Sequence, residues 1–296
     1  MKRVGVAMTV VAIGLVMVTA SWSGDAPTRP KILGIREVRI YCGESCVGSS
    51  FYSKLLPLSG DCWDCNNQTP FLVGTSQEVV LLRSNAKTSD FLAQVTFATD
   101  DLAQMERYLV SKGIKTDSEP PYLIVTDPEG HRVAFIKTFR APHLPRSEKA
   151  LAWPRRLIHA GWVVKDREAM DKFYRDVLGF HLYWQGGMTD GRVDWVSMQV
   201  PDGTDWVEYM LNVPADADKH LLGVMNHIAL GVPGVRAAAE ELKKNGMKLT
   251  EEPKIGRDGK WQLNLYDPDG TRVELMEFVP VEKPCCSEFT GEHPKP

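Results

Sequence analysis

The sequence lacks any long run of lysine or arginine, and charges of both signs are interspersed along its 296 residues. The formal net charge is only −3. Proteins that bind nucleic acid through its phosphates usually present a concentrated basic surface, so the composition gives no reason to expect a nucleic-acid partner. A hydrophobic content of 43% and a charged content of 25% are ordinary for a soluble globular protein, and the length allows two domains.

Charge is absent from one segment, Val4 to Ala20, which follows a short positive start at Lys2 and Arg3. A basic start, an apolar run and small residues ending at Ala20 are typical of a secretory signal. We therefore expect residues 1–24 to be a signal peptide and the rest of the chain to be exported, periplasmic or extracellular. The apolar run is long for a signal, so an uncleaved N-terminal membrane anchor is the alternative.

Cysteine is scarce, and its six copies fall in three local pairs, Cys42 with Cys46, Cys62 with Cys65, and Cys285 with Cys286. An even count in an exported chain favours disulfides over free thiols. A zinc site made by the first four is the alternative, but their spacing, with no histidine nearby, is not a strong zinc signature. Because adjacent cysteines rarely bond to each other, we expect one or both of the last two to pair elsewhere.

The sequence does contain an internal repeat. Three segments recur in the same order, namely Phe51–Leu58 as Phe173–Phe180, Tyr108–Lys115 as Glu241–Lys248, and Asp127–Ala134 as Asp267–Glu274. Such a repeat indicates two copies of one domain, over residues 32–140 and 155–280. Residues 141–154 between them have the polar, proline-containing character of a linker, and residues 281–296 form a C-terminal tail.

The second copy is itself built from two similar units. Each begins with a short apolar strand that carries one histidine, Leu157–Val164 with His159 and Met225–Val232 with His227. A helical pattern follows each strand, the first capped by Asp166 and ended by Gly179, the second spanning residues 234–245. The closing strands are Trp206–Met210 and Arg272–Met276. The pattern of each unit therefore predicts the element order β-α-β-β-β. With two units in each copy, the chain is predicted to contain four such modules.

Two histidines and two glutamates occupy equivalent places in these units, His159 with Glu208 and His227 with Glu274. A carboxylate inside an apolar strand is costly to bury unless it is paired or binds a metal. If the units pack with two-fold symmetry, all four side chains converge on one site. Imidazole and carboxylate ligands suit one divalent ion of zinc, nickel, cobalt, manganese or iron. The alternative is that both histidines are ordinary core residues. The occurrence of four ligand-type residues at equivalent places in two units disfavours it.

These stretches resemble the vicinal oxygen chelate superfamily, which includes glyoxalases, bleomycin-resistance proteins and extradiol dioxygenases. The resemblance is carried by Asp176–Phe180, Asn226–Leu230 and above all Trp261–Glu274. It covers residues 155–280 well and residues 32–140 weakly. It implies an α+β fold in which four β-α-β-β-β modules form two tandem domains with cup-shaped mixed sheets around one metal.

The order of the candidate ligands resembles that of lactoylglutathione lyase, or glyoxalase I. The resemblance implies that His159, Glu208, His227 and Glu274 bind the metal, and that Glu274, with Glu208 as second candidate, is the catalytic base. We therefore expect an exported glyoxalase-like metalloenzyme that performs isomerase, epimerase or lyase chemistry on an oxygen-chelating small molecule, as a monomer or homodimer. Because the glutathione adduct is cytosolic, export argues against simple methylglyoxal detoxification.

Two other readings of the resemblance stay open. Extradiol dioxygenases share the four-module length, but they use three ligands and leave the place of Glu208 vacant, and their active-site tyrosine falls here on Asn264. Non-catalytic binding proteins of the bleomycin-resistance type, which sequester an antibiotic unchanged, lack the metal ligands. The presence of Glu208 and Glu274 argues against both.

The first copy lacks most of the ligand set. Aligned by the repeat, its four positions fall near Glu37, Val80, Gln94 and Ala134, to within a residue or two. Of these, only Glu37 is a good metal ligand. We therefore expect the first copy to be a scaffold or lid that has no metal site.

Overall fold

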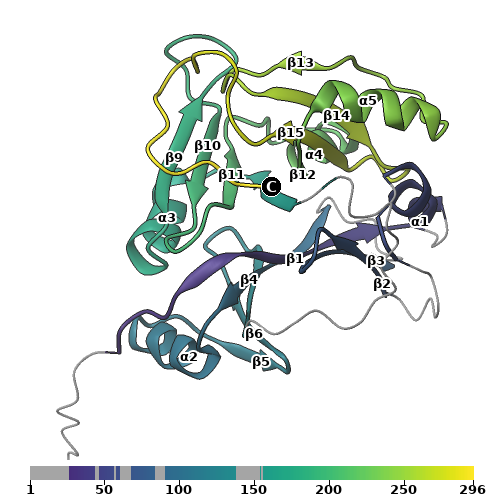
Figure 1. The fold of residues 1–296 in the computed structure, drawn as a ribbon. Coiled ribbons are helices and arrows are strands. Elements are labelled where there is room, and N and C mark those ends of the chain that lie inside the picture. The colour runs from purple at the N-terminus through teal and green to yellow at the C-terminus, as the bar shows by residue number, and fades with distance from the viewer. Residues whose placement is uncertain are drawn as a thin grey trace, which may run out of the picture.

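The computed structural model describes residues 27–43, 47–56, 58–60, 68–83, 91–137, 154 and 156–296. These residues form two β-sheets, the first from the N-terminal half and the second from the C-terminal half (Figure 1). Residues 1–24, nearly all of 141–154, and Cys46, Cys62 and Cys65 lie outside the described residues. Within the described part of the chain, no helix is long and apolar enough to cross a membrane.

The first sheet has seven strands in the order β2-β3-β1-β4-β7-β6-β5. These are β1 (Ile32–Cys42), β2 (Gln68–Val73), β3 (Gln77–Arg83), β4 (Leu92–Thr99), β5 (Asp117–Glu119), β6 (Tyr122–Thr126) and β7 (Arg132–Lys137). The helix after β1 comprises α1 (Val47–Ser50) and a π-helical turn, η1 (Phe51–Leu55), and the helix after β4 is α2 (Leu102–Ser111).

The second sheet has eight strands in the order β13-β14-β15-β12-β8-β11-β10-β9. These are β8 (Arg156–Val163), β9 (His181–Gly186), β10 (Trp195–Gln199), β11 (Trp206–Met210), β12 (His227–Val232), β13 (Lys254–Ile255), β14 (Trp261–Tyr266) and β15 (Arg272–Glu277). Its helices are α3 (Arg167–Asp171), which continues as the π-helical η3 (Lys172–Val177), α4 (Lys219–Met225) and α5 (Val235–Lys244).

The two sheets share one plan. The first strands of their two modules pair antiparallel at the centre, β1 with β4 and β8 with β12. Each central strand also pairs in parallel with the closing strand of its own module, which is β3, β7, β11 or β15. In the first module an isolated bridge from Ser59 to Leu72 stands where the other modules have a further strand. This plan confirms the expected α+β fold of four modules in two tandem mixed sheets.

The helix signals read from the sequence are confirmed. The carboxylate of Asp166 accepts a hydrogen bond from the Ala169 backbone N–H and so caps α3. Gly179 has a φ of 79°, which glycine adopts without strain, and the chain turns there into β9. The apolar face of α5 is buried at Val235, Ala238, Ala239 and Leu242. The pattern did not predict the π-helical turns or α4.

Two tyrosines at equivalent places in the repeat connect the halves of the molecule. Tyr52 follows β1 and donates a hydrogen bond to Asp267 of the second half at 3.0 Å. Tyr174 follows β8 and donates to Asp127 of the first half at 3.2 Å. Buried Phe97 and Phe180 also meet edge to face across the boundary. The apolar core is therefore continuous between the halves, and their relative position is held by matched contacts.

The C-terminal tail, yellow in Figure 1, lies along β9. The Gln185 backbone N–H donates to Ser287 Oγ, and the Thr290 N–H donates to the Tyr183 carbonyl. The expectation that the last two cysteines pair elsewhere is wrong, because Cys285 and Cys286 form a disulfide with each other. The chain turns sharply there, with a φ of 74° at Cys286 and a hydrogen bond from the Cys285 N–H to the Arg257 carbonyl. Cys42 is a buried free thiol.

Candidate metal centre

Strand register brings the four predicted ligands to one face of the second sheet. His159 on β8 and His227 on β12 come from the central antiparallel pair, in which Gly161 lies opposite His227. On the outer strands, Glu208 of β11 lies beside Gly161, and Glu274 of β15 lies beside Ala229. Since alternate residues of a strand face the same side, these positions converge. We call His159, Glu208, His227 and Glu274 the metal cup.

The distances within the metal cup fit a single ion. His159 Nε2 lies 3.1 Å from His227 Nε2, and His227 Nε2 lies 3.3 Å from Glu208 Oε2. Glu274 Oε2 lies 3.7 Å from the first imidazole nitrogen and 3.9 Å from the second. Ligands about 2.0–2.2 Å from a tetrahedral ion are roughly 3.3–3.6 Å apart. Both histidines and Glu208 form the tightest group, and Glu274 lies just outside it.

Gly161 leaves the space that the metal cup needs. A Cβ atom at this position would overlap with the imidazole ring of His227. Any larger residue would therefore push His227 away from His159. Glycine at position 161, two residues after His159 on the same strand, is therefore required by the geometry of the site.

The ionisation of the metal cup favours a bound cation. Complete burial lowers the pKa of His159 and of His227 well below its usual value, so both rings are neutral and carry a lone pair. His227 donates its Nδ1–H to the Met225 carbonyl at 2.9 Å, which leaves Nε2 as the ligand atom. Burial, only partly offset by Arg272, raises the pKa of Glu274 to about 8. A divalent ion would supply the positive charge that this carboxylate lacks.

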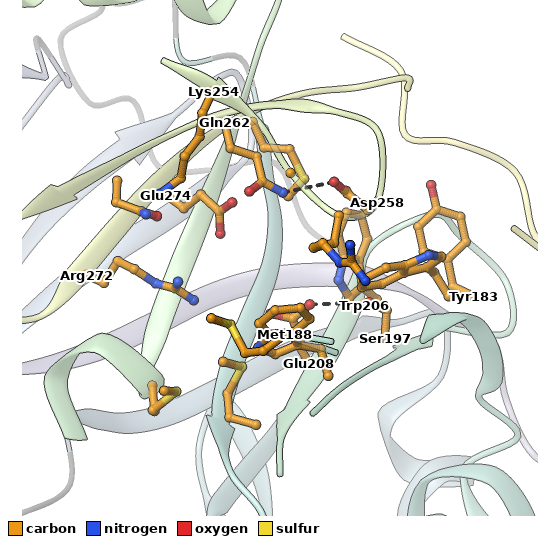
Figure 2. A pocket seen from close by; sticks show the side chains of 18 of the residues that line it. Tyr183, Met188, Ser197, Trp206, Glu208, Lys254, Asp258, Gln262, Arg272 and Glu274 are labelled. Atoms are coloured by element: carbon orange, nitrogen blue, oxygen red, sulfur yellow. Dashed lines mark hydrogen bonds between the residues drawn. The ribbon is translucent and has the colours of Figure 1, made fainter. Parts of the chain in front are cut away.

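A cavity of about 410 Å³ opens over the metal cup (Figure 2). Glu208 and Glu274 form part of its wall, and their carboxylates point into the same space. Much of the remaining wall is thioether and indole, from Met188, Met210, Met225, Met276, Trp184, Trp195 and Trp206. Three cations, Lys254, Arg257 and Arg272, also line it. The cavity is therefore mostly apolar with a few charged groups, as in small-molecule sites.

A buried lysine lies behind one wall of the cavity. Lys260 is fully buried, and its Nζ lies 4.9 to 5.1 Å from the ring centres of Trp206, Tyr183 and Phe289. Its hydrogen bond goes to the Tyr183 hydroxyl at 3.2 Å. Trp206 packs on the other side against His159, with ring centres 4.7 Å apart. Because Phe289 belongs to the tail, the C-terminal residues complete the surroundings of the metal cup.

The first sheet has a matching set of positions filled in another way. There Arg39 lies opposite Gln94 and beside Val80, while Glu37 lies opposite Thr96. Thr96 is in turn beside Ala134. This register makes Glu37, Val80, Gln94 and Ala134 the counterparts of the metal cup, in agreement with the alignment from sequence. We call this set, with Arg39, the counterpart cup.

The counterpart cup contains its own cation. Arg39 stands where the second sheet has Gly161, and its Nε donates to Glu37 Oε1 at 2.7 Å. The hydroxyl of Tyr122 donates to the other oxygen of Glu37 at 3.0 Å. Burial opposes the charge of Arg39, but attraction to Glu37 outweighs it and raises the pKa of the guanidinium. The described residues of this half contain no group of three ligands that could hold a metal.

The family described as the Glyoxalase/Bleomycin resistance protein/Dioxygenase superfamily matches residues 156–275, which contain the whole metal cup. Mitochondrial methylmalonyl-CoA epimerase from Mus musculus is 31% identical over 155 residues, which cover 49% of this chain and 86% of that protein. The chain belongs to this superfamily. Lactoylglutathione lyase from Haemophilus influenzae, another superfamily relative, is 28% identical over 123 residues, covering 41% of this chain and 91% of the lyase.

Likeness to solved structures extends the superfamily fold to both halves. The 2,3-dioxygenase LapB from Pseudomonas sp. KL28 superposes with a TM-score of 0.66, covering 91% of this chain and 96% of the dioxygenase. The sequence identity is 16%, so this likeness shows the tandem fold alone.

Three features of the site were missed by the sequence analysis. Arg272 is part of the closing motif, two residues before Glu274, and strand alternation would have placed it on the same face. Lys260 and Phe289 gave no signal, because a single lysine and a tail residue carry no periodic pattern. The burial of Lys260 depends on Tyr183, Trp206 and Phe289, which come from distant parts of the chain.

Proposed function

We propose that this chain is a divalent-metal-dependent enzyme that transfers a proton at a carbon atom next to a carbonyl group, as lyases, epimerases and isomerases do. The observation that carries this proposal is the set of two histidines and two glutamates around one space, with Glu208 3.3 Å and Glu274 3.9 Å from the same imidazole nitrogen. A metal held by these residues would act as a Lewis acid on the oxygen atoms of the substrate.

Glu274 is the proposed catalytic base. Its carboxyl group lies in the cavity wall and is 4% exposed. Burial favours its protonated form, and a carboxylate with a raised proton affinity is a better base than one in water. In this proposal Glu274 Oε2 takes the proton from the substrate carbon and returns it, to the same or an adjacent carbon. Glu208, whose carboxylate accepts a hydrogen bond from Ser197 at 3.4 Å, is the second candidate.

In this scheme the neutral histidines hold their positions and transfer no proton to or from the substrate. His227 is oriented by its hydrogen bond to the Met225 carbonyl, and His159 is packed against Trp206. Walls of indole and thioether groups limit the access of water to the site. This protects a carbanion-like transition state from protonation by solvent. The epimerase and the lyase among the relatives support proton transfer as the reaction class. We also propose, from residues 1–24 alone, that the enzyme is exported.

The proposal is tested by exchange of substrate protons with solvent. We expect zinc-, nickel- or cobalt-loaded protein to exchange the proton next to the carbonyl of 2-oxo acids or thioesters in deuterium oxide, observed by proton NMR. The variant Glu274→Gln should keep about one equivalent of metal and lose at least about a hundredfold of the exchange rate. Glu282→Gln, a change at an exposed residue of the tail, is the matched control and should exchange like the native protein.

Two outcomes would count against this function. Full exchange by the Glu274→Gln variant would remove the assigned base. Aerobic cleavage of a catechol by the ferrous form, with no exchange by any metal form, would show a dioxygenase instead. Tight binding of a ligand that is released unchanged, again without exchange, would show a binding protein.

A further inference from the structure

Arg272 differs from the other two cations of the cavity because it has no partner. Lys254 forms an ion pair with Glu251 at 2.8 Å. Arg257 donates to the Gly187 carbonyl and to Asp190. Among the described residues, no partner forms a hydrogen bond or an ion pair with the Arg272 side chain, and its Nε is buried without an acceptor. Its charge is therefore available within the cavity.

The position of Arg272 places that charge beside the metal cup. It lies on β15 two residues before Glu274, so both side chains leave the same face of the strand roughly 6.6–6.8 Å apart. Across the strand pair, Arg272 is the register partner of His227. Figure 2 shows its guanidinium group pointing into the cavity beside the carboxylate of Glu274. Neither carboxylate of the metal cup comes within ion-pair distance of it.

A buried N–H group without an acceptor is costly, and a ligand anion would satisfy the Nε–H of Arg272. Arginine presents a planar set of N–H groups that matches a carboxylate in a two-point contact. The apolar walls around it exclude water and strengthen such a contact.

We propose that Arg272 binds a carboxylate of the substrate, so that the substrate is an acidic oxygen chelator with a second anionic group a few bonds from the chelating oxygens. The thioether and indole walls then contact an apolar remainder of the substrate, which can extend toward Met188, an exposed residue of the cavity lining. This inference rests on the proposed function of the same site. It adds the charge and shape of the molecule on which that site acts.

The test compares ligands that differ only in the second carboxylate. Zinc-loaded protein is titrated calorimetrically with 2-oxoglutarate and 2-oxopentanoate, and with the longer pair 2-oxoadipate and 2-oxohexanoate. Two lengths are used because the anion must span the distance from the metal cup to Arg272. We expect the dicarboxylate of at least one pair to bind about tenfold tighter or more. In Arg272→Met this preference for the dicarboxylate should disappear.

Matched variants make the result specific. Lys254→Met removes a cavity cation that is already paired, and the dicarboxylate preference should survive it. Arg272→Lys keeps the charge but loses the planar contact, so it should show a reduced preference. This variant also serves if Arg272→Met fails to fold, which circular dichroism and metal content would reveal. An equal preference in native protein and both Arg272 variants, or none at either length in the native protein, would overturn the inference.

The same titration separates this inference from the proposed function. If the protein binds no zinc but still prefers dicarboxylates through Arg272, the metal proposal fails and the carboxylate contact stands. If zinc binds and monocarboxylates chelate it without any charge preference, the metal proposal stands and the Arg272 contact fails.

Discussion

The two cups of this protein share one strand register and differ in what neutralises their buried carboxylates. In the counterpart cup, Arg39 takes the place of Gly161, and its guanidinium forms an ion pair with Glu37 at 2.7 Å. In the metal cup, Gly161 leaves that space open, and two neutral imidazoles and two carboxylates surround it. At one position of the first strand, the first half therefore carries its own cation, Arg39, where the second half has Gly161 beside a group of residues that could hold a metal.

The largest effect should follow from closing the open space. We expect Gly161→Ala to weaken metal binding by roughly 10–100-fold, because the new methyl group displaces a ligand imidazole. Overpacking should also lower the free energy of unfolding by about 1–3 kcal/mol. Metal content after dialysis and urea unfolding measure the two effects. Gly234→Ala, where a Cβ would meet only Ala237 at 4.0 Å, is the control. Unchanged metal affinity in Gly161→Ala would show that metal binding does not need the space at Gly161.

The second effect is on the counterpart cup. Arg39→Met should lower the free energy of unfolding by roughly 3 kcal/mol, because Glu37 is left buried without its cation. The double variant Glu37→Gln/Arg39→Met should recover part of that loss, since no unpaired charge remains. Metal content should stay unchanged in both. If the single variant is as stable as the native protein, Arg39 does not stabilise the buried carboxylate of Glu37.

A third test concerns Lys260, which is fully buried in the second half. Burial, partly offset by the charge of Asp258, lowers the pKa of Lys260 to about 8, against an ordinary value of 10.5. Below pH 8 both folded and unfolded chains carry the charge, and the folded state bears the full cost of burying it. Between pH 8 and 10.5 the folded state loses the proton first, so stability rises with pH.

We therefore expect the free energy of unfolding of the native protein, relative to Lys260→Met, to increase by about 3 kcal/mol from pH 7.5 to 10.5. Urea unfolding at several pH values measures this difference. The Met variant is the internal reference, because it cancels the titration of groups that do not interact with residue 260. A difference that stays flat or falls with pH would show that Lys260 is not held as a costly charge.

The smallest effects should be the matched ones. Tyr52→Phe and Tyr174→Phe each remove one hydrogen bond from a hydroxyl to a buried aspartate of the other half. Each should lower the free energy of unfolding by about 1 kcal/mol. Equal losses would support a two-fold related boundary between the halves. A loss confined to one variant would show that the boundary is held mainly from one side.

Much of this architecture can be predicted from the sequence. The repeat of Asp127–Ala134 as Asp267–Glu274 predicted four modules, and the alternation around His159 and His227 predicted which face they share. The register of the counterpart positions also followed, because strand pairing is fixed by the same buried pattern in both copies.

Other features depend on contacts between segments that are distant in the chain. The sequence does not show that Arg39 replaces Gly161, since this requires the pairing of β1 with β4 to be known. The burial of Lys260 follows from the tail, which brings Phe289 against it. The bond between Cys285 and Cys286 likewise depends on a turn that the Arg257 carbonyl holds.

The metal content of the purified chain tests the central claim most directly. Elemental analysis of protein loaded with zinc and then desalted should find one equivalent per chain, and His227→Ala should lose it while Glu37→Gln retains it. Retention of the ion by the His227→Ala variant, its loss from Glu37→Gln, or a second tightly bound equivalent would contradict the assignment of a single metal to the cup formed by His159, Glu208, His227 and Glu274.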